Sequence, residues 1–252
     1  MIPLKSPREV ARMRESGAVA AAIMDELVGM VREGITTGEL DAHAEKLMRD
    51  AGAVSASRGY RGYPAHICIS VNEQVVHGIP GPRKLKSGDI VSLDVSLQLD
   101  GYCADLARTV AVGEVDGEKR SLMAAAKEAL EAGIAQAQPG NRLFDISHAI
   151  EETARRNKFS VVRRFTGHGI GREMHEEPQI PNYGKPHTGP KMLTGMTFAI
   201  EAMLNAGTHR VNVLDDDWTA VTADGRPSAH FEDTVAITAE GPEVLTCRKS
   251  NQ

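Results

Sequence analysis

Apolar residues recur at helical spacing in four stretches of the chain, and these stretches form two pairs. The predicted helices cover residues 7–32, 36–52, 118–138 and 142–157. Capping boxes open the first two helices, at Ser6-Pro7-Arg8-Glu9 and at Thr36-Thr37-Gly38-Glu39. Gly52 ends the second helix and Pro139-Gly140 ends the third. The chain therefore begins with one helix pair, and a second pair follows near its middle.

Between and after the helix pairs, the pattern changes to that of β-strands. Runs rich in β-branched residues, with partial alternation, cover residues 67–71, 89–99, 196–204 and 230–238. Asp100-Gly101 is typical of a two-residue hairpin turn. This turn would pair Leu99 with Tyr102 and would place Asp105 opposite Ser96. We therefore expect an antiparallel hairpin that begins near residue 89.

The chain also contains an internal repeat. Similar sequences join the two helices of each pair at Gly34 and Gly140, and residues 88–94 match residues 195–201 at nearly the same interval. Two short matches can arise by chance, but here the helix pairs and the carboxylates match together. The interval is too long for a solenoid. The pattern therefore favours an α+β fold of two similar halves about a pseudo-two-fold axis.

Four carboxylates occupy corresponding places in this repeat. Asp94 and Asp105 share one face of the predicted hairpin, and we assign Glu201 and Glu232 to the equivalent positions of the second half. Carboxylates that point inward among apolar residues are costly unless a positive charge compensates them. Arg108 could do so, but two bound divalent ions would better relieve the repulsion. The alternative for any one of these acids alone is a solvated surface position.

Three histidines have sequence contexts that suit a functional site. His168 lies in the glycine-rich residues 167–171, where the lack of side-chain bulk allows close approach to a ligand or another backbone. His175 follows seven residues later and could reach the same cavity, and His77 lies in a turn-like segment after the first strand. The other histidines are interpreted as ordinary core or surface residues: His43, His66, His148, His187, His209 and His230.

Composition then narrows the class of protein. The 252 residues include 29 Lys and Arg against 34 Asp and Glu, a formal net charge of -5. This acid excess argues against a nucleic-acid-binding protein, and a metal site would account for most of it. There are three cysteines without CxxC spacing, no signal peptide, and no apolar stretch of about 20 residues. These features favour a cytoplasmic protein that does not contact membranes.

Taken together, these residues resemble those of the type I methionine aminopeptidases, in their short bacterial form. The resemblance rests on VHGIP at 76–80, GDIVSLD at 88–94, GHGIGREMHEEP at 167–178 and WTA at 218–220. It implies the pita-bread fold, in which two pseudo-symmetric halves share a curved antiparallel sheet flanked by helices. Residues 1–252 would then form a single catalytic aminopeptidase domain with an internal pseudo-two-fold repeat.

The resemblance also implies a role for each candidate residue. Asp94 would bind the metal ion nearer the substrate amine, Asp105 and Glu232 would bridge two ions, and His168 and Glu201 would bind the other ion. Glu201 would in addition act as general base and then general acid. The two remaining catalytic histidines would contact the substrate and steady the tetrahedral centre: His77 and His175. The methionine side-chain pocket would be lined by Tyr60, Tyr63, Cys68, Met174 and Trp218.

The implied activity is the removal of the initiator methionine from nascent polypeptides, with a preference for small penultimate residues. A hydroxide that bridges two divalent ions would be the nucleophile, and the ligands suit cobalt, manganese, iron or zinc. We expect a cytoplasmic monomer that meets nascent N-termini near the ribosome and binds no nucleic acid. Three residues depart from the family pattern and leave efficiency and pocket fit open: Ala202, Met174 and Ser57.

Two other functions remain open at this point. A proline-specific aminopeptidase or prolidase would use the same five metal ligands, but such enzymes usually carry a separate N-terminal domain, for which this chain has no room. A non-catalytic pita-bread protein could serve as a binding module. Relatives of that kind tend to lose metal ligands, and all five are present here.

Overall fold

The four predicted helices are present in the computed structural model, which describes residues 2–247. The first and the last five residues of the predicted 1–252 domain lie outside the described residues. The helices are α1 (Pro7–Met30), α2 (Thr37–Asp50), α3 (Gly117–Gln136) and α4 (Leu143–Arg156). Both predicted capping boxes form, since Ser6 and Thr36 accept from the N–H groups of Glu9 and Glu39 while each glutamate accepts in return. The predicted helices are therefore confirmed to within two residues at each end.

The predicted strand runs are also confirmed, as parts of one antiparallel sheet. Its long strands are β4 (Ile90–Leu99), β5 (Tyr102–Ala111), β9 (Thr197–Asn205) and β12 (Ser228–Thr238). Its short strands are β1 (Val54–Ser55), β2 (Cys68–Val71), β6 (Ser160–Val161), β7 (Thr166–Gly169), β8 (Glu176–Pro181) and β13 (Gly241–Val244). The main order is β1-β4-β5-β12-β9-β7-β8. A smaller sheet holds β10 (Val211–Val213), β11 (Ala220–Thr222) and β3 (Gln74–Val76), and a 3-10 turn spans Tyr60–Gly62.

The hairpin of β4 and β5 has the predicted register. Leu99 pairs with Tyr102 across the turn, and Ser96 pairs with Asp105. Asp100 and Gly101 have φ angles of 49° and 79°, as the tight hairpin turns that match strand twist require. The short sequence Asp-Gly thus sets the face on which every residue of the hairpin lies.

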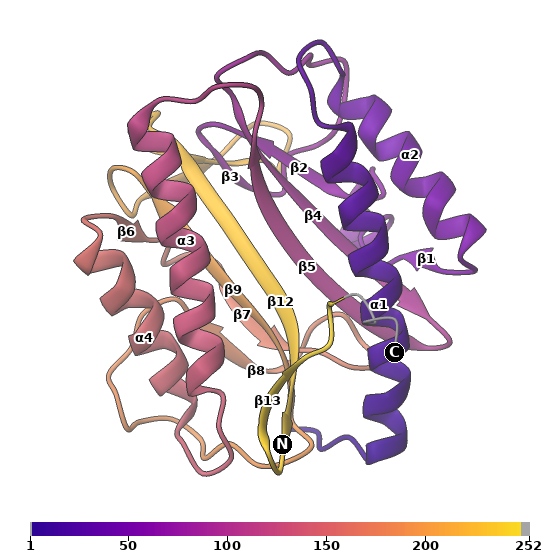
Figure 1. Cartoon of the computed structure of the whole chain (residues 1–252), viewed down its shortest axis with the longest axis vertical. Helices are drawn as coiled ribbons and strands as arrows, with labels where there is room; N and C mark the ends of the chain where they lie inside the picture. The colour runs from indigo at the N-terminus through magenta and orange to yellow at the C-terminus, as the bar shows by residue number, and fades with distance from the viewer. Residues whose placement is uncertain (1, 248–252) are drawn as a thin grey trace.

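The helices pack on one face of the main sheet, and the candidate metal ligands lie on the opposite face. Figure 1 shows α1 and α2 as one pair and α3 and α4 as the other, with the long strands running between and behind them. Leu93 and Val95 of β4 are buried in the core beneath α1 and α2, so Asp94 between them points to the opposite face. Ile200 of β9 packs in the core beneath α3 and α4, and Glu201 points away in the same manner. Among residues 2–247, no helix has the length and apolarity needed to cross a membrane.

The two halves meet where β5 lies beside β12, and here one prediction needs correction. Asp94 pairs with Ala107 in the first half, and Glu201 pairs with Glu232 in the second. Glu232 therefore corresponds to Ala107 and not to Asp105, so the predicted equivalence is wrong by two residues. Because side chains alternate with a period of two, a shift of two residues keeps Glu232 on the predicted face.

Candidate metal centre

The residues predicted for the site line one cavity of about 590 Å³. They are Asp94, Asp105, His168, Glu201, Glu232, His77, His175, Tyr60, Tyr63, Cys68, Met174 and Trp218. They come from both halves of the chain, so the fold brings together side chains that are far apart in the sequence. The roles assigned to them individually stay predictions.

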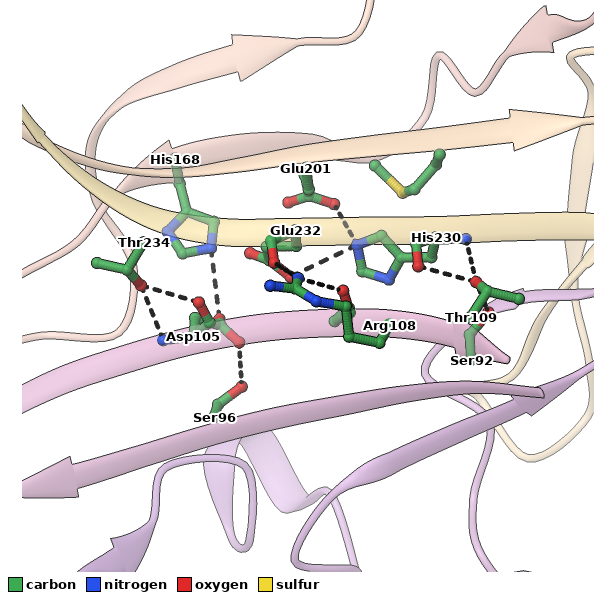
Figure 2. A network of polar contacts seen from close by, with 12 residues as sticks. Ser92, Ser96, Asp105, Arg108, Thr109, His168, Glu201, His230, Glu232 and Thr234 are labelled. Atoms are coloured by element: carbon green, nitrogen blue, oxygen red, sulfur yellow. Dashed lines mark hydrogen bonds and ion pairs between the residues drawn. The ribbon is translucent and has the colours of Figure 1, made fainter. Parts of the chain in front are cut away.

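The carboxylates project from the four long strands toward one another. Asp105, His168 and Glu232 each offer a ligand atom, and these atoms lie within 4.8 Å of one another. Ser96 donates a hydrogen bond of 2.8 Å to Asp105 Oδ1, and His168 Nε2 lies 3.9 Å from Asp105 Oδ2. Figure 2 shows Asp105, His168 and Glu232 close together, with Ser96 below Asp105. The arrangement is that of a compact donor cluster fixed by antiparallel strands.

Burial makes this cluster electrostatically costly without a cation. Burial raises the pKa of Asp94 well above its usual range, and the neighbouring carboxylates of Asp105 and Glu201 raise it further. The same causes raise the pKa of Glu201 to about 8 and that of Glu232 well above its usual range. A divalent ion would restore the ionised forms, because opposite charge lowers the pKa of a carboxyl group.

The protonation and orientation of the His168 ring suit a metal ligand. Burial lowers the pKa of His168 to about 4, so the ring is neutral at neutral pH. Its Nδ1 lies 2.9 Å from the carbonyl oxygen of Gly169. Because a carbonyl can only accept, Nδ1 carries the hydrogen and Nε2 keeps its lone pair for the cavity. A ligating histidine is commonly oriented by such a bond from its other ring nitrogen.

Two buried polar atoms in the cluster have no hydrogen-bond partner among the described residues, which supports a bound cation. They are Glu232 Oε1 and His230 Nε2, both buried. His230 Nε2 lies 3.4 Å from Glu232 Oε2 and 3.8 Å from Glu201 Oε2. Orphaned buried polar atoms are rare in native proteins. Four carboxylates and an imidazole form a hard to borderline donor set, which fits a divalent ion of the first transition row.

His230 is a cavity residue that the sequence interpretation missed. Its sequence context predicts an ordinary core or surface position, yet His230 lines the cavity and faces two carboxylates. The available clue was its position two residues before Glu232 on one strand, which places both side chains on the same face.

Arg108 does not compensate the carboxylate cluster. Its Nη2 donates a 2.6 Å hydrogen bond to Asp233 Oδ1, and its Nη1 donates to the backbone carbonyl oxygen of Glu232. Asp233 also accepts a hydrogen bond from Thr246. The positive charge of Arg108 is therefore paired with Asp233. A bound cation remains the better candidate to relieve the repulsion among the clustered carboxylates.

The protein stripped of metal ions is expected to lose stability as the pH rises. The pKa of Glu201 is raised from 4.5 to about 8, so the folded chain binds more protons than the unfolded chain between these values. The free energy of unfolding then falls with rising pH, and Glu201 alone contributes about 2 kcal/mol of loss between about pH 6 and pH 8. Thermal unfolding of chelated protein at both pH values, with and without Mn²⁺, measures this. Glu201→Gln is the control and should weaken the pH dependence; a chelated parent that gains stability at pH 8 would contradict the prediction.

An apolar compartment adjoins the carboxylates. Tyr63 and Cys68 are buried together with Ile79 and Trp218 beside them. The rings of Tyr63 and Trp218 meet edge to face at 5.0 Å. Cys68 pairs with Asp94 across β2 and β4, so this compartment begins directly beside the cluster. The cavity therefore combines an apolar part with the carboxylate cluster.

Two further histidines flank the cluster without joining it. The ring of His175 lies 4.3 Å from that of His168 and 5.0 Å from that of Tyr60. Burial lowers the pKa of both His77 and His175 to about 4, so both are neutral donors at neutral pH. His77 has a φ angle of 60°, and such strained non-glycine backbone is typical of functional positions.

The glycines around His168 allow close backbone approach, as the sequence predicts. A Cβ atom at Gly167 would lie 2.6 Å from the carbonyl oxygen of Ala199, and one at Gly169 would lie 2.1 Å from that of Glu177. Neither position can hold a larger residue without movement of the neighbouring strands. The close approach is to neighbouring backbone, and it fixes His168 between β8 and β9.

The chain is similar along nearly its whole length to known metallopeptidases. The model of metallopeptidase family M24 matches residues 11–239. The chain is 48% identical to methionine aminopeptidase 1 of Bacillus subtilis, over 98% of this chain and 99% of the relative. It is 49% identical to the methionine aminopeptidase of Clostridium perfringens, over 99% of this chain and all of the relative.

Solved structures give the same result and separate two groups. The methionine aminopeptidase of Rickettsia prowazekii matches with a TM-score of 0.97 and 38% identity, over 98% of this chain and all of that chain. The methionine aminopeptidase of Thermotoga maritima has a TM-score of 0.96 and 44% identity, over 99% of this chain and all of that chain. The prolidase of Pyrococcus furiosus has a TM-score of 0.77 and 22% identity. It is covered over only 66% of its length, and this likeness concerns the fold alone.

Proposed function

The chain belongs to metallopeptidase family M24, and on this premise we propose that it removes the N-terminal methionine of proteins and peptides. The relatives that match it along its whole length are methionine aminopeptidases. The observation that carries the proposal is the cavity itself. In it, five candidate metal donors lie beside a buried apolar compartment.

Two divalent ions would be held by the five donors Asp94, Asp105, His168, Glu201 and Glu232. When bound, such ions lower the pKa of water and polarise a carbonyl group, which makes hydrolysis possible near neutral pH. The donor set suits cobalt, manganese, iron or zinc alike. The pKa values of these carboxyl groups are raised by burial and by one another, which supports occupancy by divalent cations.

The position of the cut follows from the order of pocket and cluster. Cys68 in the apolar compartment pairs with Asp94 at the edge of the cluster. A methionine side chain in the compartment would therefore place its own α-amine on the Asp94 side. Only the first residue of a substrate chain has a free α-amine. The peptide bond that is cleaved would therefore be the one after the first residue of the substrate.

The remaining steps belong to three side chains. His175 is a neutral donor beside His168 and would donate to the carbonyl oxygen of the first peptide bond as negative charge develops. His77 would hold the amide from the far side of the cavity. Glu201 would accept a proton from the attacking water and then deliver it to the leaving amine.

A peptide-release assay tests the proposal against the proline-specific alternative. We expect release of methionine from Met-Ala-Ser after chelation and reloading with Mn²⁺ or Co²⁺, with slower release from Met-Leu-Ser if the cavity favours small penultimate residues. Gly-Pro peptides should be poor substrates. Faster cleavage of Gly-Pro peptides would favour a prolidase, and a metal-loaded protein inert on every peptide would favour a binding module.

The setting of the reaction belongs to the same proposal. We propose that the protein works in the cytoplasm as a monomer, acts on nascent N-termini near the ribosome and does not bind nucleic acid. Its net charge of -5 supports the last point, since phosphate binding needs clustered positive charge. Ala202 continues the ladder of β9 opposite Phe231, so its departure from the family pattern leaves Glu201 on the cavity face.

A further inference from the structure

The two carboxylates proposed to bridge the metal ions stand on opposite sides of the junction between the halves. Asp105 belongs to β5 and Glu232 to β12. These strands share one regular ladder pair among the described residues, Glu232 with Ala107. The distance between the side chains of Asp105 and Glu232 therefore depends on the other contacts between β5 and β12, including hydrogen bonds from side chains.

A threonine hydroxyl supplies this contact for Asp105. Thr234 Oγ1 accepts a 3.0 Å hydrogen bond from the backbone N–H of Asp105 and donates a 2.8 Å bond to the backbone carbonyl oxygen of Asp105. Thr234 is fully buried, and Figure 2 shows both bonds at the left of the network. One hydroxyl thus satisfies both backbone polar groups of the ligand residue, while Ser96 holds its side chain.

The internal repeat contains a second threonine whose hydroxyl bonds both backbone polar groups of a residue on the opposite strand. Thr109 Oγ1 accepts a 2.8 Å bond from the N–H of His230 and donates a 2.8 Å bond to the carbonyl oxygen of His230. Thr109 follows Ala107 by two residues and Thr234 follows Glu232 by two residues, so the register makes the two threonines equivalent. We call this pair, Thr109 and Thr234, the threonine latch. Only the Thr234 side of the latch holds a proposed metal ligand.

We propose that Thr234 is a positioning residue that sets Asp105 against Glu232 and thereby determines the affinity for divalent ions. Its hydroxyl replaces two ladder hydrogen bonds at the point where the halves join. Loss of the hydroxyl would leave two backbone polar groups of Asp105 buried without partners, so the ligand residue would move. Residues that orient metal ligands commonly change affinity tenfold to a hundredfold when altered. The inference rests on the proposed metal site.

The test is calorimetric titration of the chelated full-length protein with Mn²⁺. Thr234→Val keeps the shape of the side chain without its hydroxyl, and we expect the tighter Kd for Mn²⁺ to rise by at least about tenfold. Thr234→Ser restores the hydroxyl and should bind Mn²⁺ within about threefold of the parent. Thr109→Val is the matched control, because it removes the equivalent pair of hydrogen bonds to the backbone of His230. It should lower the melting temperature as much as Thr234→Val does, with a smaller change in Mn²⁺ affinity.

The outcomes separate this inference from the proposed function. If the parent takes up no Mn²⁺, the metal site itself is wrong. If the parent binds Mn²⁺ and Thr234→Val binds it equally well, only the positioning role fails, and the hydroxyl serves stability alone. Equal losses of affinity in Thr109→Val and Thr234→Val would also overturn it, as would a Thr234→Ser variant as weak as Thr234→Val. Thr234→Ala provides a second protein without the hydroxyl should Thr234→Val not fold.

Discussion

Asp105→Ala is expected to retain at most one divalent ion per chain and to release methionine at least about a thousandfold more slowly than the parent. In its proposed bridging role Asp105 would bind both ions, so its removal would weaken the binding of both. Asp105 is buried at the centre of the donor cluster, within 4.8 Å of ligand atoms of His168 and Glu232. Metal content by atomic emission and methionine release measured on the same samples check both parts of the prediction.

The control for Asp105→Ala is a buried aspartate elsewhere. Asp145 accepts hydrogen bonds from the backbone N–H groups of Arg142 and His187 at the start of α4. Asp145→Ala should therefore lower stability and leave the metal content unchanged. If Asp105→Ala keeps two ions and full activity, the assignment of the site is wrong.

His175→Ala is expected to lower kcat by about a hundredfold to a thousandfold, as loss of one donor to a developing oxyanion typically does. The metal content should stay at the parent value, because His175 is not among the five proposed donors and its ring lies beside that of His168. Since the donor acts as charge develops, KM should change less than kcat. Steady-state kinetics on Met-Ala-Ser, together with metal analysis, separate these effects.

An exposed histidine provides the comparison for His175→Ala. The His187 side chain is 90% exposed and lies 3.5 Å from Asp145. His187→Ala should keep the parent kcat. A His175→Ala protein that lacks metal would show that His175 is a ligand, which contradicts its proposed role as a donor to the substrate.

Much of the fold could be predicted from the sequence because its determinants are local. The capping boxes at Ser6 and Thr36 mark helix starts by bonds within four residues. The Asp100-Gly101 turn sets the register of β4 and β5, and that register places Asp105 opposite Ser96. The period of two along a strand then puts the candidate ligands on one face. These steps need no knowledge of the other half.

What the sequence left undetermined lies where the two halves meet. The pairing of Glu232 with Ala107 joins strands that are far apart in the chain, and no local pattern encodes it. The predicted equivalence of Asp105 with Glu232 failed for this reason. The same junction brings His230 to face the carboxylates and directs Arg108 to Asp233. The contacts of His230 and of Arg108 are both tertiary. The sequence next to each of these residues is that of an ordinary β-strand, so it does not predict them.

The division of the donors between the halves orders events during synthesis of the protein. Asp94 and Asp105 are made first, and His168, Glu201 and Glu232 follow in the second half of the chain. β12, which carries Glu232, is the last long strand. The proposed donor set is therefore incomplete until β12 has been translated and has docked. At the proposed site, ion binding would therefore follow the docking of β12, and the binding free energy would then resist separation of the first half from the second.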